Sequence, residues 1–199
     1  MNKLSRSDLM PLERYAAERA GFRAKVIAHR KLRSLALGEH ASLIFEDRLT
    51  VQYQVQEMLR IEQIFQASGI QGELDAYNPL IPDGGNLKAT LLLEFTDPVE
   101  RFDRLSRLVG IEHRVYAEVA ASVRVFACAD EGLDRSSAVK TSAVHFLRFE
   151  FAPTAIAALR KGASLSIGID DARLPERSLV VEGARLALLN DFSPEWGAP

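Results

Sequence analysis

Hydrophobic residues recur at helical spacing in the first third of the chain. The first set comprises Leu12, Tyr15, Phe22 and Val26. Because an α-helix turns once every 3.6 residues, this spacing predicts a helix over about residues 11–33. A second set predicts another helix over about residues 48–68, which Gly69 ends. Between them, residues 34–46 read as two short strands joined by a turn at Gly38.

Alternation of apolar and polar residues predicts strands in the second half. Residues 87–95 place one apolar face on Leu87, Ala89, Leu91, Leu93 and Phe95. Helix 98–109, strand 113–127, strand 143–151, helix 153–161 and strands near 164–169 and 178–189 follow. This β-α-β-β-α-β order predicts an α+β fold: two N-terminal helices and a short hairpin packed on a split-βαβ (ferredoxin-like), mainly antiparallel sheet.

The least regular segment is AYNPLIPDGGN, residues 76–86. Asn78-Pro79 and Ile81-Pro82 disfavour a helix, and the Asp-Gly-Gly that follows is typical of a turn. We therefore expect a loop junction at 76–86 between a helical N-terminal part, residues 1–75, and a sheet part, residues 87–199. The length of 199 residues suits one compact domain.

The amino-acid composition excludes some cofactor sites and gives an expectation for the location of the protein. Cys128 is the only cysteine, which excludes an intramolecular disulfide and any iron–sulfur cluster or multi-cysteine zinc site within this single chain. We expect its thiol to be buried and inert. There is no run of about 18 apolar residues to span a membrane, and no apolar signal core near the start, so we expect a cytoplasmic protein.

Charge is uneven along the chain. Residues 1–40 carry nine Lys or Arg and four Asp or Glu, a net +5, which leaves −7 for the rest of a chain whose total is −2. A basic helix can bind nucleic acid. The sequence pI near 6.1 and the lack of interleaved aromatic residues favour another interpretation, in which a basic helix packs beside an acidic one.

Two carboxylates stand in or beside an apolar stripe of the predicted helix 48–68. Glu62 shares a face with Val51, Val55, Met58 and Phe65, and Glu57 lies on the neighbouring flank, whereas Gln52, Gln56 and Gln63 form the opposite face. An unpaired buried carboxylate costs several kcal/mol by order of magnitude. We expect a salt bridge to a basic residue of the first helix, namely Arg19, Arg23 or Arg30. The alternative is that Glu57 and Glu62 line a cavity.

His145 lies on the apolar face of strand 143–151, with Leu147, Phe149 and Phe151. We interpret it as a core histidine that bonds to the backbone. The alternative is a carboxylate–imidazole metal site with Glu57 or Glu62, although the histidines are not at ligand spacing.

Lys88 and Glu94 lie on the face of strand 87–95 opposite its apolar residues. This face is either solvated or the floor of a groove beneath the 76–86 loop, with Tyr77 and Asn78 as edge contacts. A polar loop, residues 130–142, contributes Arg135, Ser136, Ser137, Lys140 and Thr141, which could hold a phosphate or carboxylate. The alternative is a mobile surface loop.

Four phrases in this order resemble an uncharacterised bacterial family, domain of unknown function family 3501: FEDRLTVQYQVQEMLRIE, YNPLIPDGGNLKATLLLEF, LVGIEHRV and TSAVHFLRFE. The resemblance covers nearly the whole chain from LMPLERY onward. It implies a context rather than a reaction, because members tend to be encoded near rubrerythrin-like proteins and iron–sulfur oxidoreductases. Such a redox partner would carry any iron–sulfur cluster.

The resemblance and the periodicity together indicate a set of candidate binding residues. They are Glu57, Arg60, Glu62, Tyr77, Asn78, Lys88, Glu94, His145 and Arg148, with Glu57, Glu62 and His145 also as candidate metal ligands. Our first hypothesis is a binding or accessory protein of redox or peroxide-stress metabolism, with a polar pocket for a small anion or metal. The second is an interaction protein that docks a redox partner or a second copy on the glutamine face. The third is a small enzyme with Glu62 or His145 as general base.

Overall fold

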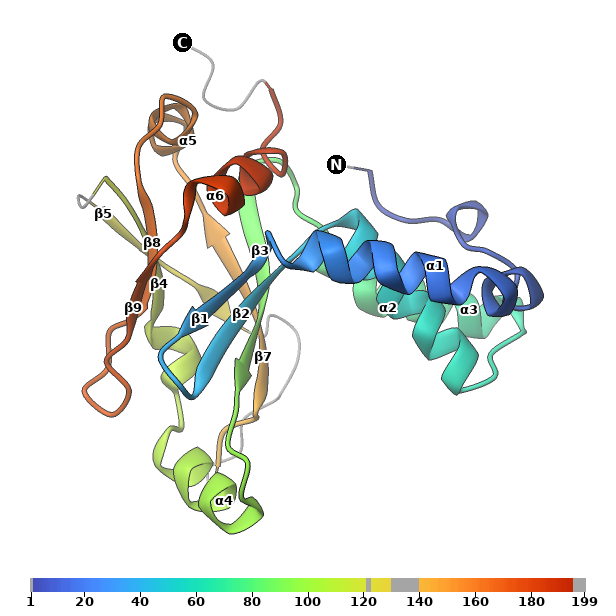
Figure 1. The fold of residues 1–199 in the computed structure, drawn as a ribbon, viewed down its shortest axis with the longest axis horizontal. Helices are drawn as coiled ribbons and strands as arrows, with labels where there is room; N and C mark the ends of the chain where they lie inside the picture. Colours follow the sequence, from blue (N-terminus) through green and yellow to red (C-terminus); the bar gives the residue numbers. More distant parts are fainter. Residues whose placement is uncertain (1, 121–122, 130–139, 195–199) are drawn as a thin grey trace.

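Strands with alternating apolar residues build two antiparallel sheets in the computed structural model, which describes residues 2–120, 123–129 and 140–194 (Figure 1). The five-stranded sheet has the order β1 (Ser34–Leu37), β2 (Ala41–Glu46), β3 (Asn86–Leu93), β7 (Val144–Glu150) and β6 (Cys128–Ala129). The four-stranded sheet has the order β5 (Val123–Phe126), β4 (Val115–Val119), β8 (Leu165–Ile169) and β9 (Arg177–Leu179). We call these two sheets and their surrounding helices the body.

One hydrophobic core lies between the sheets. Leu43, Leu87 and Phe149 contribute to it from the five-stranded sheet, and Val115 and Ile167 from the four-stranded sheet. Removing so much apolar surface from water is the main driving force for the fold. Around this core lie α4 (Pro98–Arg107), α5 (Pro153–Arg160), α6 (Glu182–Leu189) and the short 3₁₀ turn η3 (Ile111–Arg114).

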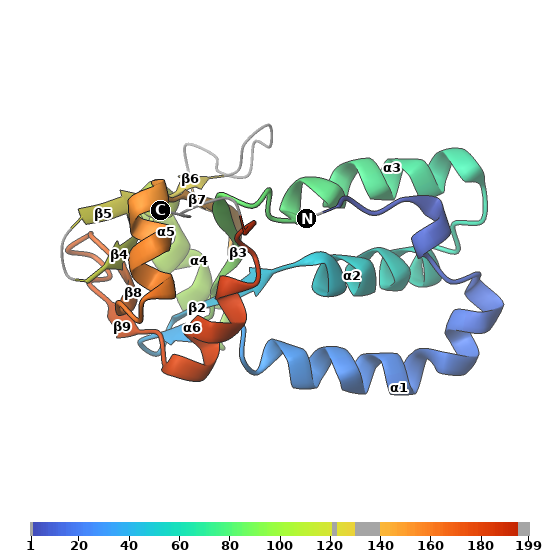
Figure 2. The same ribbon diagram turned by 90° about the horizontal axis from the view of Figure 1, so that it is seen from above.

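Three helices form an arm that projects from one side of the body (Figure 1). They are α1 (Leu12–Arg30), α2 (Arg48–Ile61) and α3 (Ala67–Tyr77), accompanied by the 3₁₀ turns η1 (Arg6–Asp8) and η2 (Asn78–Leu80). The middle helix is α2, with α1 and α3 on its two sides (Figure 2). A second apolar cluster, which includes Val51, Leu59 and Leu74, holds the arm together. No helix in the described ranges is long and apolar enough to cross a membrane.

The α+β class is confirmed, and so are the predicted strand 87–95 and the helices 98–109 and 153–161. The ferredoxin-like detail is not confirmed, because the strands divide over two sheets. The hairpin of residues 34–46 does not pack on a sheet but pairs with β3 as part of one. The predicted strand 113–127 is the antiparallel pair β4 and β5, and the predicted strand 178–189 is β9 followed by α6.

The predicted helix 48–68 is shorter than expected. It ends at Ile61, and Gln63 follows in the left-handed conformation with φ of 54°. Few residues other than glycine adopt this conformation, and it reverses the chain. A further helix, α3, which the sequence did not predict, then begins at Ala67.

Arg33 joins the arm to the body. This side chain is 2% exposed and lies between the end of α1 and the start of β1. It donates to the backbone oxygens of Phe45 (2.9 Å) and Glu46 (3.0 Å) at the end of β2, and forms an ion pair with Asp191, which follows α6. Its Nε also lies 3.6 Å from the carboxylate of Asp47.

Asp47 extends this cluster into the arm. Its carboxylate caps α2 by accepting from the backbone N–H groups of Leu49 and Thr50, each at 3.0 Å, and lies 2.5 Å from His29 Nε2. Two carboxylates thus share the Arg33 guanidinium. Burial raises the pKa of Asp191 to about 6 and outweighs the opposing effect of Arg33, and the negative charge of Asp47 adds to the rise.

The raised pKa of Asp191 leads to a testable prediction about stability. A folded pKa of about 6 lies above the ordinary value of 3.8, so the folded protein binds this proton more tightly than the unfolded chain. Relative to Asp191→Asn, the wild type should therefore gain stability as pH falls from about 6 to 4, on the order of 2 kcal/mol. Urea unfolding of both proteins at several pH values measures this gain. A difference that stays constant with pH would contradict the assignment.

Candidate functional site

A cavity of about 350 Å³ lies where the arm meets the five-stranded sheet; we call it the junction cavity. Its lining residues are Arg30, Ile44, Glu46, Val51, Gln54, Tyr77, Leu80, Thr90, Val144 and Phe146. They come from α1, α2, the α3–η2 segment and three neighbouring strands. Cavities of this size hold small organic ligands in many proteins.

Strand register builds the floor of the junction cavity. Ile44 on β2 pairs with Thr90 on β3, and Thr90 pairs with Phe146 on β7. Since successive side chains point to opposite faces of a sheet, this row faces the arm while its neighbours enter the core. The adjoining row on the same face is charged: Glu46 pairs with Lys88, and Lys88 with Arg148.

Opposite charges enter the junction cavity from different elements. The Glu46 carboxylate is buried and accepts a hydrogen bond from Thr90 Oγ1 at 2.7 Å. The Arg30 side chain comes from the last turn of α1, and its guanidinium carbon lies 5.8 Å from the centre of the Tyr53 ring. Within the described part of the chain, no ion pair joins Arg30 to Glu46.

The Arg30 Nε–H is buried and has no hydrogen-bond partner among the described residues. Leaving a buried donor unpaired costs about 1–3 kcal/mol, and more for a charged group. Native proteins therefore seldom keep such a group unless something else pairs with it. The arrangement can bind a molecule that brings an acceptor to Arg30 and a donor to Glu46.

One of the candidate binding residues lines this cavity, and two others, Lys88 and Asn78, belong to the elements that build its walls. The lining residue is Tyr77. Lys88 lies on the same face of β3 and donates to the Pro79 backbone oxygen and to Asp83, each at 2.7 Å, which holds the loop in place. Asn78 bonds both backbone groups of Leu4, at 2.7 and 2.9 Å. On the outer face of β3, Lys88 and Thr90 are therefore buried beneath the arm and the loop, whereas Glu94 on the same face is exposed to solvent.

Glu57 lies between the helices of the arm. It accepts hydrogen bonds from Arg19 Nη2 (2.7 Å) and Nε (2.8 Å), from Tyr15 Oη (2.7 Å) and from Arg60. The hydrogen bonds from Arg19, above all, lower the pKa of Glu57 to about 2. The expected salt bridge from this helix to α1 is thus present for Glu57. Arg60 takes part in the same cluster.

The expectation for Glu62 was wrong. Glu62 is the C-cap residue of α2 and is exposed. The face of α2 that is buried runs through Val51, Val55 and Leu59, at intervals of four, and the helix ends before it reaches position 62. The basis for placing Glu62 in a cavity or at a metal is therefore removed.

The glutamine face of α2 is also not exposed as expected. Gln56 is 0% exposed and pairs both backbone groups of Met10, at 2.6 and 3.3 Å. Gln52 donates to the Asp8 backbone oxygen at 2.6 Å. The N-terminal segment thus covers Gln52 and Gln56 and supplies the polar partners they need, whereas Gln63 is exposed.

His145 lies in the core face of β7, as predicted, and is fully buried. It shares a hydrogen bond of 2.8 Å with Thr141 Oγ1, which is a side-chain partner, whereas we expected a bond to the backbone. The Glu112 carboxylate lies 3.9 Å away. Glu57 and Glu62 lie in the arm, whereas His145 is buried in the body, so neither glutamate is its neighbour. Among the described residues, no group of three potential ligands is placed to hold a metal.

The other candidates lie apart from the junction cavity. Glu94 is exposed and accepts from Ser42 at 3.0 Å, and Arg148 forms an ion pair with Glu150. Cys128 is exposed rather than buried as expected, because the edge strand β6 leaves it at the surface. Of the 130–142 loop, residues 130–139 lie outside the described part of the chain, including Arg135, Ser136 and Ser137.

Sequence reasoning missed Arg30 and Glu46 as partners in one site. Arg30 was considered only as a salt-bridge partner, and Glu46 stands directly before the helix cap Asp47, where acidic residues are common. The available signal was the alternation of Ile44 and Glu46, which puts both on the outer face of β2. Nothing local indicates that an arm covers that face.

Comparison with known proteins identifies relatives. A family model described as protein of unknown function (DUF3501) matches residues 3–192. A crystal structure from Burkholderia pseudomallei K96243, described as a novel protein of unknown function, is 48% identical to this chain. It superposes with a TM-score of 0.92 and covers 96% of this chain and 100% of its own. No curated protein matches this chain.

The contrast between two glutamates of the arm is testable. Glu57→Gln should destabilise the protein by about 1.5–3 kcal/mol, because it removes the charge that binds Arg19 and Tyr15. Glu62→Gln should change stability by less than about 0.5 kcal/mol, as expected of an exposed position. Urea unfolding at pH 7 measures both. Equal losses would show that Glu62, too, has a buried partner.

Proposed function

The chain belongs to the DUF3501 family, a family of proteins of unknown function, and on this premise we propose that it is a cytoplasmic binding or accessory protein whose ligand occupies the junction cavity. The observation that carries the proposal is a cavity lined by both Arg30 and the buried Glu46, which form no ion pair with each other in the described structure. The cavity thus offers a strong donor and a strong acceptor to one small molecule.

The lining defines the chemistry of the ligand. Arg30 favours a ligand with a carboxylate or another anionic group, since guanidinium binds planar oxyanions in a bidentate manner. Glu46 favours a ligand that also carries a hydrogen-bond donor, such as an ammonium or hydroxyl group. Val51 and Phe146 would contact the apolar part of the ligand. A small amino acid, hydroxy acid or related compound meets these requirements, whereas Arg30 disfavours a metal cation in the same space.

The resemblance described above supports a place in redox or peroxide-stress metabolism. In this proposal the redox centre belongs to a rubrerythrin-like or iron–sulfur oxidoreductase partner, because a chain with one cysteine cannot hold an iron–sulfur cluster by cysteines alone. The chain would bind or deliver a small molecule, and the partner would transfer electrons.

An interaction role is supported by a different observation. Ile61 and Phe65 are both exposed at the turn between α2 and α3. Large apolar side chains that are close together on a surface are typical of contacts with other proteins. The end of the arm is therefore where a partner would dock, and this role is compatible with a ligand in the junction cavity.

Binding can be tested with a panel of amino acids, hydroxy acids and dicarboxylates at millimolar concentration, by thermal shift and then calorimetry. We expect at least one compound to bind the wild type, and Arg30→Met and Glu46→Gln to weaken it at least about tenfold, since each loses a charged hydrogen bond.

The matched control is Arg23→Met, an exposed arginine on the same helix that does not line the cavity. It should bind like the wild type. A panel without any binder, or a binder whose affinity is the same in Arg30→Met and Arg23→Met, would contradict the proposal.

A further inference from the structure

The end of the arm that lies farthest from the body carries a groove of about 260 Å³; we call it the tip groove (Figure 2). It lies between the N-terminal segment and the turn that joins α2 to α3. The lining is apolar apart from two charged residues, Arg6 and Glu13, and includes Leu59, Ile64, Phe65 and Ile70. The tip groove shares no lining residue with the junction cavity, so it is a separate place on the molecule.

The turn that forms one wall of the tip groove is held in a defined conformation. Gln63 has a left-handed backbone with φ of 54°, and the Ile64 N–H donates to the Leu59 backbone oxygen at 2.9 Å. The Ile64 side chain packs against Gly69, where an added Cβ atom would lie only 2.6 Å from it. A strained residue that its surroundings keep in place is a reason to look for a function at this turn.

The turn presents large apolar side chains beside the hollow. Phe65 lines the tip groove and is nevertheless 63% exposed, and Ile61, four residues earlier, is 60% exposed. Water is an unfavourable environment for so much apolar surface, and a partner that covered it would gain free energy from the hydrophobic effect. The same patch therefore contains a projecting aromatic ring and an apolar hollow.

Two unpaired charges of opposite sign border the tip groove. Neither Arg6 nor Glu13 forms an ion pair or a side-chain hydrogen bond with any described residue. The adjacent Arg14, in contrast, pairs with Glu18 at 2.8 Å. The charges of the lining sum to zero, so the tip groove does not favour a strongly acidic or a strongly basic partner.

We propose that the tip groove is the interface of a two-fold homodimer, in which Phe65 of each copy enters the groove of the other and Arg6 of each copy pairs with Glu13 of the other. In a two-fold interface the same patch meets itself. A ring beside a hollow and a cation beside an anion are then both matched by a second copy. This inference rests on the interaction role proposed for the end of the arm, and it names the partner as a second copy of this chain.

The position of the tip groove suits such a pair. Because the arm projects from the body, two arms can meet at their ends while the two bodies stay apart (Figures 1 and 2). An interface made by the end of the arm alone is small for a specific complex, so we expect weak association, with a Kd on the order of 10 µM. The junction cavity, where the arm meets the body, would stay accessible in both copies.

Sedimentation velocity of the full chain between about 1 and 500 µM, a range on both sides of the expected Kd, tests the proposal. We expect a change from monomer to dimer with rising concentration and no larger species, because a two-fold pair closes on itself. Phe65→Ser should weaken the dimer at least about tenfold, since a buried aromatic anchor is lost.

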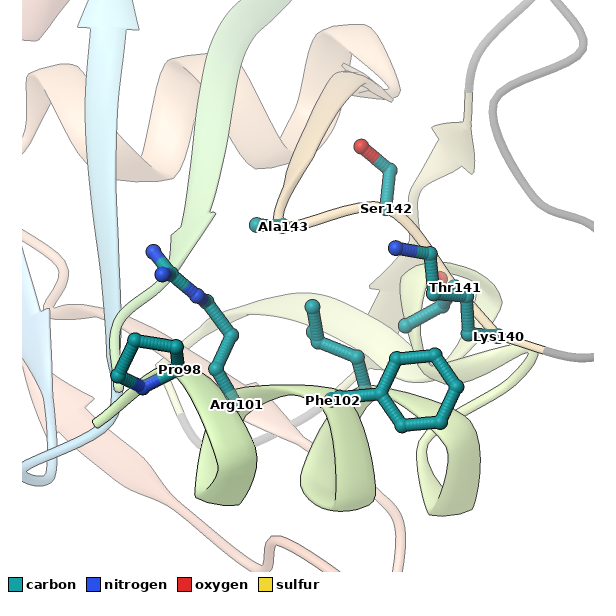
Figure 3. A pocket seen from close by; sticks show the side chains of 8 residues that line it. Pro98, Arg101, Phe102, Lys140, Thr141, Ser142 and Ala143 are labelled. Atoms are coloured by element: carbon teal, nitrogen blue, oxygen red, sulfur yellow. The ribbon is translucent and has the colours of Figure 1, made fainter. Parts of the chain in front are cut away.

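The matched control is Phe102→Ser. Phe102 is 55% exposed, close to the value for Phe65, but it belongs to α4 in the body and lines a different cavity (Figure 3). This variant should dimerise like the wild type. Arg30→Met should also leave the dimer unchanged, so a failure here is distinguishable from a failure at the junction cavity.

Exchange of the charges tests the two-fold arrangement. Arg6→Glu and Glu13→Arg should each weaken self-association at least about tenfold, because like charges then meet twice across the interface. An equimolar mixture of these two variants should restore the dimer, since each contact again joins opposite charges. The double variant should dimerise like the wild type for the same reason. Both positions are exposed, so thermal unfolding of each variant should match that of the wild type.

Three results would overturn the proposal. They are a wild type that stays monomeric up to about 500 µM, equal dimer affinities of the Phe65 and Phe102 variants, and a mixture of the two charge variants that stays monomeric. Binding of a redox protein through Phe65 by a chain that does not self-associate would overturn it as well. The interaction role would then stand, with another protein rather than a second copy as the occupant of the tip groove.

Discussion

A single buried guanidinium determines how the arm meets the body. Arg33 contacts the last carbonyls of β2, the carboxylate that caps α2, and Asp191 near the end of the chain. A buried charge of this kind is stable only while its partners stay in place, and removing one partner costs about 3–5 kcal/mol. Arg30 lies one helical turn before Arg33, and Glu46 is one of the residues whose carbonyl it binds. The same contacts thus set the distance between the two charged walls of the junction cavity.

Local sequence patterns were sufficient to predict the elements whose periodicity and boundaries are marked by their own residues. The first helix, strand β3, and the helices α4 and α5 follow from periodicity, helix caps and Pro or Gly boundaries. The division into two sheets did not follow, because it depends on which strands pair over long distances: β2 finds β3 across an entire pair of helices. For the same reason the helix α6 was read as a strand, since a short apolar run fits either structure until its packing is known.

The candidate site could be predicted only in part. Glu57 was expected to pair with the first helix, because charge is a local signal. A groove beneath the loop, with Lys88 on its floor and Tyr77 at its edge, was one of the two arrangements that the alternation of β3 left open. Glu62 was misplaced because a helical wheel assumes that the helix continues, and Gln63 ends it. Arg30 and Glu46 were not recognised as one site because Arg30 ends α1 and Glu46, 16 positions later, ends the second strand of the hairpin. Their proximity is a property of the tertiary fold.

The way the N-terminal segment is held has a consequence for sequence variation. Asn78 binds both the N–H and the C=O of Leu4, and Gln56 binds both the N–H and the C=O of Met10, so two side-chain amides bond the backbone as a neighbouring β-strand would. Recognition of this kind reads backbone rather than side-chain identity. An insertion or deletion between these two anchors would shift one of them out of register. The number of residues between Leu4 and Met10 is therefore constrained separately from the side-chain contacts that Asp8 makes with Ser5 and Arg48.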